Sequence, residues 1–129
     1  MSATMIAAYA AGIDVFVTGG IGGVHRGFEQ TMDVSADLDE LSRTPLTVVS
    51  AGIKSILDIG RTLEYLETKG VPVMTFKGSN FPAFFSTSSG IPSPFTINSE
   101  IEAAKIIYAH QQLGLENGLL VAVPNSNPC

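Results

Sequence analysis

The sequence predicts an α/β protein in which helices cover both faces of a layered sheet, an α/β/α arrangement. Short apolar runs that suit buried strands alternate with longer segments of helical periodicity. The composition agrees, because 45% of the residues are hydrophobic and only 15% are charged. A length of 129 residues fits one domain and is enough to bury a core.

The first half of the chain supplies two helices and two strands. Residues 2–11 are predicted to form a helix packed on the sheet rather than a secretion signal, because no basic region precedes them. The other elements expected here are a strand at 14–18, a helix at 36–42 with Ser35 as its N-cap, and a buried strand at 46–50.

The second half begins with the most regular helical pattern. Apolar residues at 56, 59, 63 and 66 predict a helix over residues 53–69, with Ser55 and Asp58 as a capping box and Gly70 just beyond its end. The remaining elements are a strand at 71–76 whose Pro72 marks a sheet edge or a strand start, a long loop at 77–96, a helix from the Ser99–Glu102 capping box to about 113, and a strand at 118–123.

Charge and composition exclude several classes of function. The net charge is −5 and the seven basic residues are scattered, so the basic surface of a nucleic-acid-binding protein is missing. No run approaches the roughly eighteen continuous apolar residues of a membrane span. The lone cysteine, Cys129, excludes an internal disulfide framework. We expect a cytoplasmic protein that binds neither nucleic acid nor membrane.

Five of the ten residues from Thr18 to Gly27 are glycine, directly after the first predicted strand. The P-loop pattern fails for lack of a lysine, and the dinucleotide fingerprint fails because position 25 is histidine. Two interpretations stay open: backbone N–H groups that bind a phosphate with help from Thr18, or a tight turn that needs glycine for steric reasons. His25, beside Arg26, is either a pocket residue or a structural one.

A second cluster of polar residues follows, at Asp33, Ser35 and Asp37. If a helix begins near Ser35, its first amides form an anion site, and Asp33 just outside suits a hard divalent cation. The alternative is plain helix capping followed by a solvated acidic first turn at Asp37, Asp39 and Glu40.

Lys54 is the sharpest catalytic candidate. It follows the buried strand at 46–50, at the carboxyl end where open α/β sheets bind their ligands. Partial desolvation at such a place can lower the pKa of a lysine enough for it to attack a carbonyl and form a Schiff base. The alternative is a surface lysine at a helix start, which the helix dipole disfavours.

The residues above carry a resemblance to the pseudouridine-5′-phosphate glycosidases. It rests on the order and spacing of the segments at 16–27, 33–38, 48–58 and 62–68, with Pro82-Ala83-Phe84-Phe85 and Asn117-Gly118. The chain is similar to a central part of that family, and we expect it to be truncated at both ends. The glutamate that donates a proton in the family, and an asparagine thought to recognise uracil, have no counterpart here.

The resemblance implies reversible cleavage of the C–C glycosidic bond of pseudouridine 5′-phosphate to uracil and ribose 5-phosphate. It implies that Lys54 is the nucleophile of an imine adduct and that Asp33 is a ligand of manganese, Mn²⁺. It also implies an α/β/α fold that assembles as a homotrimer. The substrate-binding positions it implies are Thr18, His25, Ser35, Ala36 and Asp37. The alternative is an inactive phosphosugar-binding or interaction module derived from such an enzyme.

Overall fold

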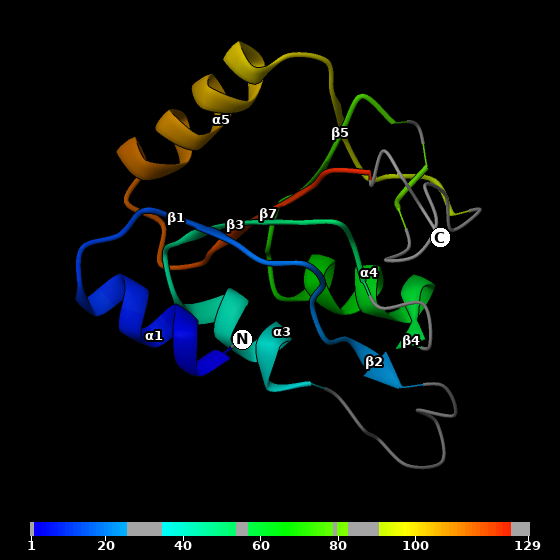
Figure 1. The fold of residues 1–129 in the computed structure, drawn as a ribbon, viewed down its shortest axis with the longest axis horizontal. Helices are drawn as coiled ribbons and strands as arrows, with labels where there is room; N and C mark the ends of the chain where they lie inside the picture. Colours follow the sequence, from blue (N-terminus) through cyan, green and yellow to red (C-terminus); the bar gives the residue numbers. More distant parts are fainter. Residues whose placement is uncertain (1, 26–34, 54–56, 79, 83–90, 125–129) are drawn as a thin grey trace.

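The computed structural model of the chain describes residues 2–25, 35–53, 57–78, 80–82 and 91–124 (Figure 1). Its main sheet has five parallel strands in the order β1-β3-β7-β5-β6, and a separate two-stranded antiparallel sheet pairs β2 with β4. The elements are α1 (Ser2–Ala10), β1 (Val15–Val17), β2 (Val24–His25), α3 (Ala36–Arg43), β3 (Thr47–Ser50), β4 (Leu57–Asp58), α4 (Ile59–Thr68), β5 (Val73–Phe76), β6 (Thr96–Ile97), α5 (Glu100–Gln112) and β7 (Leu119–Ala122).

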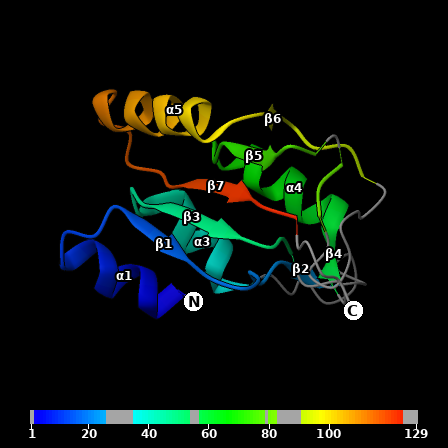
Figure 2. The same ribbon diagram turned by 45° about the horizontal axis from the view of Figure 1, so that its top comes forward.

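Three layers result, which confirms the predicted α/β/α class. Helices α1, α3 and α4 lie on one face of the sheet and α5 lies on the other (Figures 1 and 2). The connections explain this division. Those from β1 to β3 and from β3 to β5 advance in one direction across the sheet, whereas the connection from β6 to β7 runs back. Because parallel crossovers are right-handed, a reversal of direction moves the helix to the opposite face.

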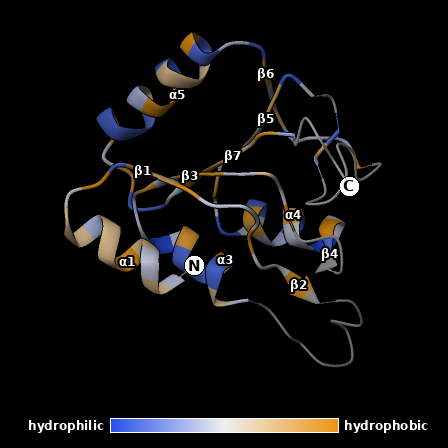
Figure 3. Cartoon of the chain, viewed as in Figure 1, coloured by the Kyte–Doolittle hydropathy of each residue, from blue (hydrophilic) through white to orange (hydrophobic). Residues whose placement is uncertain are grey.

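Strand β7, at the centre of the sheet, shows how the two cores are built. Its side chains alternate, so that Leu120 and Ala122 join the larger core with residues of α1, α3 and α4. Leu119 and Val121 join the second core, against which α5 packs through residues such as Ile106. Since β7 is buried on both faces, it is apolar throughout, as Figure 3 shows for the middle of the sheet.

The predicted helix at 53–69 is wrong in its first part. Helix α4 begins at Ile59, with Asp58 as its N-cap, and the Asp58 carboxylate accepts the Arg61 N–H at 3.0 Å. Ile53 instead forms a bridge with Ile21, because its buried side chain packs in the larger core. The apolar positions thus keep helical spacing from a strand-like segment into the helix. Periodicity alone therefore does not show where the helix begins. Ser55 lies outside the described residues.

The other boundaries agree closely with prediction. Gly70 has φ +74° just beyond α4, as a helix C-terminus requires, and β5 begins directly after Pro72. The Ser99 hydroxyl accepts the Glu102 N–H at 3.1 Å, but the Glu102 carboxylate reaches the N–H of Asn98 instead of closing the box on Ser99. Within the described ranges, no helix is both long and apolar enough to cross a bilayer.

Candidate active site

The segments that follow β1 and β3 leave the sheet side by side at its carboxyl edge. The Thr18 N–H donates to the Val49 carbonyl at 2.9 Å, and farther on Ile21 forms a parallel bridge with Ile53. The glycine-rich segment therefore runs beside the residues that precede position 54. This edge is where open α/β sheets place their ligand sites.

Two glycines of this segment are required by close packing. A Cβ atom at Gly22 would lie 2.3 Å from Ser35 Oγ, and one at Gly23 would lie 2.5 Å from Thr62 Oγ1. No side chain fits at such distances unless its neighbour moves. At these two positions the steric interpretation of the glycines is correct.

Backbone amides of the same segment already have partners within the protein. The Gly22 N–H donates to Asp37 Oδ2 at 2.9 Å, and the Val24 N–H donates to Thr62 Oγ1 at 2.9 Å. These two amides are therefore not available to a phosphate. For these two amides the phosphate-binding interpretation does not hold, because they already donate to side-chain oxygens of the protein.

Ser35 and Asp37 form a structural junction. Ser35 is the N-cap of α3, and its hydroxyl accepts the Asp37 N–H at 3.1 Å, which confirms the capping interpretation. The Ser35 N–H donates to the carbonyl of Gly23 at 3.0 Å, and Asp37 Oδ1 accepts the Ser2 N–H at 3.0 Å. Asp37 thereby fastens both the glycine segment and the start of α1 to α3. Ala36, the first residue of α3, is exposed.

Thr62 is the site residue that the sequence analysis missed. It is fully buried in α4, and its hydroxyl donates to the Asp58 carbonyl at 2.6 Å while accepting the Val24 N–H. The same hydroxyl therefore joins the two strands of the small sheet, in which Val24 pairs with Asp58 and His25 pairs with Leu57. A threonine inside a helix, with a carbonyl four residues earlier to bond, is the signal that sequence offers.

Lys54 and Asp33 lie outside the described residues, as do Arg26 and Gly27. The residues that flank positions 54–56 are described. Ile53 pairs with Ile21, and Leu57 pairs with His25. The chain is thus fastened to the glycine-rich segment both before and after positions 54–56.

The acidic first turn of α3 is only partly solvated, which corrects the expectation for Glu40. Glu40 is 3% exposed, and its carboxylate accepts hydrogen bonds from Arg43, at 2.9 Å, and from the Thr44 hydroxyl. The hydrogen bond from Arg43 holds the pKa of the Glu40 carboxyl below its usual value. Asp39 accepts the Tyr65 hydroxyl at 2.6 Å, and that bond raises the pKa of Tyr65. These carboxylates hold α3 together and to α4.

The part of the chain that the structure describes contains no cluster of side chains that could bind a metal ion. No group of three or more histidine, cysteine, aspartate or glutamate side chains lies together there. Asp37, the carboxylate nearest the glycine segment, already accepts two backbone N–H groups. The described residues therefore do not form a manganese site by themselves.

Comparison with known proteins identifies relatives that are named for the metabolism of pseudouridine. A pseudouridine-metabolizing bifunctional protein of Schizosaccharomyces pombe is 60% identical over 100% of this chain and 18% of its own length. A pseudouridine-5′-phosphate glycosidase of Caldanaerobacter subterraneus subsp. tengcongensis is 58% identical over 96% of this chain and 40% of its own length. The chain thus spans two fifths or less of these two relatives, and the resemblance seen in the sequence is confirmed.

Solved structures agree with these relatives. The prealnumycin C-glycosynthase AlnA, solved in complex with ribulose 5-phosphate, superposes with a TM-score of 0.89 at 43% identity, covering 94% of this chain and 40% of that one. An indigoidine synthase A-like protein of Thermotoga maritima gives a TM-score of 0.86 at 44% identity. The family pattern described as indigoidine synthase A like protein matches residues 1–129. The chain therefore belongs to the indigoidine synthase A-like protein family.

Proposed function

We propose that this chain is part of a pseudouridine-5′-phosphate glycosidase, which reversibly cleaves the C–C glycosidic bond of pseudouridine 5′-phosphate to give uracil and ribose 5-phosphate. The observation that carries the proposal is the 58% identity to a glycosidase of that name over 96% of the chain. The fold agreement with a C-glycosynthase holding a pentulose phosphate supports the same substrate class.

The chemistry favours a lysine nucleophile. A C-nucleoside has no glycosidic oxygen to protonate, so the paired carboxylates of ordinary glycosidases have no leaving group on which to act. We propose that the neutral Lys54 amine forms a bond to C1′ of the ribose while the bond from C1′ to the ring oxygen breaks, and that a proton passes from the nitrogen to the ring oxygen. The nitrogen lone pair then forms the imine as the C1′–C5 bond breaks and uracil C5 takes a proton. Water hydrolyses the imine, which releases ribose 5-phosphate and restores the lysine.

The arrangement around Lys54 supports this role. The described residues on both flanks of positions 54–56 pair with the glycine-rich segment, Ile53 with Ile21 and Leu57 with His25. We propose that Thr18 and His25 line the substrate pocket and that Ser35 and Ala36 contact the substrate from the start of α3. Asp37 acts mainly as a positioning residue, because its carboxylate accepts the N–H groups of Gly22 and Ser2.

The manganese site and the homotrimer remain proposals from the resemblance. Asp33 would supply a carboxylate, an oxygen ligand that suits Mn²⁺. When bound, a divalent cation neutralises negative charge on a phosphorylated substrate. Since the described residues do not complete the ligand set, no step of the reaction above depends on the metal. A cytoplasmic location likewise stays a prediction.

Reductive trapping tests the proposal directly. The chain is incubated with ribose 5-phosphate, treated with borohydride and analysed by intact mass and peptide mapping. We expect an adduct on Lys54 that Lys54→Ala abolishes, while Lys105→Ala, at an exposed lysine of α5, leaves it unchanged. An adduct that survives in Lys54→Ala contradicts the proposed nucleophile. Binding of ribose 5-phosphate without any adduct indicates the inactive phosphosugar-binding module instead.

Uracil release tests the full reaction. The substrate is pseudouridine 5′-phosphate with manganese, and both this chain and a chimera are assayed. In the chimera this chain replaces the matched 124-residue stretch of the Caldanaerobacter glycosidase, which restores the other 60% of that protein. We expect the chimera to release uracil and its Lys54→Ala variant to lose the activity. A folded chimera that releases none argues against the enzyme.

A further inference from the structure

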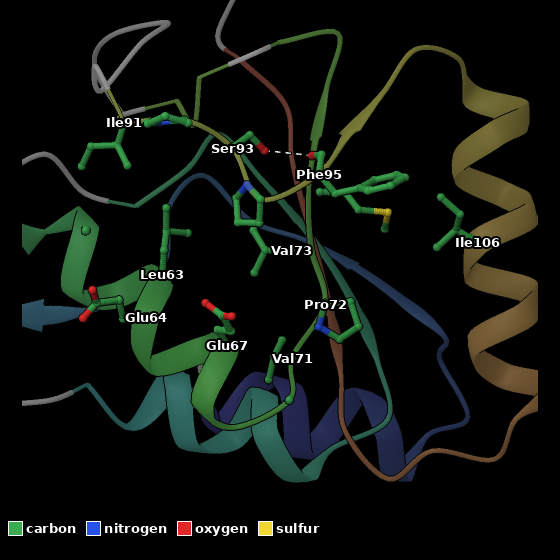
Figure 4. Close-up of a pocket in the computed structure, with 15 residues that line it drawn as sticks. Leu63, Glu64, Glu67, Val71, Pro72, Val73, Ile91, Ser93, Phe95 and Ile106 are labelled. Carbon is green, nitrogen blue, oxygen red and sulfur yellow. Dashed lines mark hydrogen bonds between the residues drawn. The ribbon is translucent and has the colours of Figure 1, made fainter.

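A cavity of about 990 Å³ lies away from the carboxyl edge of the sheet. It is a groove beside the amino-terminal half of β5, between α4 on one face and α5 on the other (Figure 4). Figure 4 shows Leu63 and Glu67 on the α4 side, Ile106 on the α5 side and Val73 in the middle. We call this cavity the β5-edge groove.

The floor of the β5-edge groove is an incompletely paired strand edge. Strand β6 pairs only with Thr75 and Phe76 of β5. On that side the N–H of Thr75 donates to the Phe95 carbonyl at 2.8 Å, and the N–H of Lys77 donates to the Ile97 carbonyl at 2.7 Å. Because alternate residues of a parallel strand face the same neighbour, the peptide groups of Val73 face this side as well. Among the described residues, no strand pairs with Val73 there.

The chain before β6 turns away instead of continuing the ladder. Pro92 and Pro94 lack N–H groups, and between them the Ser93 hydroxyl donates to the Phe95 carbonyl at 2.8 Å. This local hydrogen bond bends the segment away from an extended course. The groove is therefore left open where the next strand of the sheet would lie.

The lining of the groove identifies the chemistry of its occupant. Its walls are mainly apolar and include Leu63, Val71 and Ile106, and Phe95 is 51% exposed there. Its described lining residues include no lysine or arginine, which argues against a sugar phosphate. Two exposed carboxylates of α4, Glu64 and Glu67, belong to the lining. An extended peptide fits all three features, since it pairs with the strand edge, covers both apolar walls and can offer a basic side chain to the glutamates.

We infer that the β5-edge groove binds an extended polypeptide segment from the part of an indigoidine synthase A-like domain that this chain does not include. The matched relatives and structures have such a part, because this chain covers only 40% of the Caldanaerobacter glycosidase and 40% of AlnA. The segment adds a strand beside Val73, with apolar side chains toward α4 and α5 and a lysine or arginine near Glu67. The inference rests on family membership and groove geometry, not on the proposed reaction.

Amide hydrogen exchange measured by NMR tests the inference at Val73. In the free chain the Val73 amide must exchange much faster than that of Thr75, which is bonded to Phe95. In the chimera with the Caldanaerobacter glycosidase, an added strand must slow the Val73 amide on the order of 100-fold. Equal protection of both amides in the free chain overturns the inference. So does a folded chimera in which Val73 is no slower than in the free chain.

A charged side chain in the groove gives a second, independent test. Phe95→Glu in the chimera buries a carboxylate against the added segment, and we expect the melting temperature to fall by about 4 °C or more. The same substitution in the free chain is the matched control, because Phe95 is half exposed there, and we expect a change below about 1 °C. Equal effects in the two proteins contradict the inference. Val73 protection that rises with the concentration of the free chain indicates a second copy in the groove and overturns it.

Discussion

The carboxylate of Asp37 accepts the backbone N–H of Gly22 at 2.9 Å, across fifteen positions of the sequence. Its other oxygen accepts the N–H of Ser2 at 3.0 Å. One side chain at the start of α3 thus holds the glycine-rich segment and the first residue of α1. The relationship makes Asp37 a determinant of the shape of the site whatever ligand the site binds.

Asp37→Ala is expected to destabilise the chain by about 1–3 kcal/mol, because the Gly22 N–H loses a charged acceptor. Asp37→Asn keeps one oxygen acceptor and should cost less. Urea unfolding followed by circular dichroism measures both changes. Glu64→Ala, on the exposed side of α4, is the control and should stay within about 0.5 kcal/mol of the parent. An Asp37→Ala variant as stable as this control would show that the junction contributes nothing.

Gly23→Ala is expected to destabilise the fold by about 2 kcal/mol or more, because the new methyl group meets Thr62 Oγ1 at 2.5 Å. If that contact is the cause, adding Thr62→Ala must relieve the clash, and the double variant must lose less than the sum of the single losses. Chemical denaturation of all four proteins gives the coupling free energy. Gly60→Ala is the control: its nearest neighbouring atom would be 3.7 Å away and it lies in helix α4, so we expect a gain of about 0.5 kcal/mol.

Thr62→Val keeps the shape of the side chain and removes the hydroxyl. The Val24 N–H is then buried without its acceptor, so we expect a loss of about 1–3 kcal/mol and faster exchange of the Val24 amide. Thr62→Ser retains the hydroxyl and should restore Val24 protection, at the smaller cost of one missing methyl group. Native-state hydrogen exchange separates the outcomes, and equal exchange in the Val and Ser variants contradicts the role given to the hydroxyl.

Acid should weaken the chain partly through Glu40. Its pKa is lowered in the folded state by the hydrogen bond from Arg43, so its stabilising contribution is present above the unfolded-state pKa of about 4.5 and is lost as the pH falls through the folded-state value. We expect Glu40→Gln to flatten the fall in unfolding free energy below about pH 4.5. Denaturation midpoints measured from pH 7 to pH 3 test this. An unchanged slope in Glu40→Gln would assign the acid sensitivity to other carboxyl groups.

Local sequence patterns were sufficient to predict most strands of the main sheet and the helices that cover it. The apolar runs at 46–50 and 118–123 predict β3 and β7, and Ser35 and Ser99 mark the starts of α3 and α5. These signals lie within a few residues of the element that they specify, because a buried strand needs apolar side chains and a helix start needs a capping oxygen. No local pattern predicts the strands β2 and β4, because each has only two residues and forms by pairing with the other.

The sequence by itself determined the class of this protein, its family and the residues proposed to act on a substrate, since those depend on residue type and spacing. Tertiary structure decided which backbone groups already have hydrogen-bond partners and which positions have no room for a side chain. Asp37 and Thr62 take up backbone N–H groups of the glycine-rich segment, and positions 22 and 23 need glycine because the side chains of Ser35 and Thr62 lie against them. Contacts between residues 13 to 39 positions apart depend on how the layers pack, and no local pattern encodes such packing.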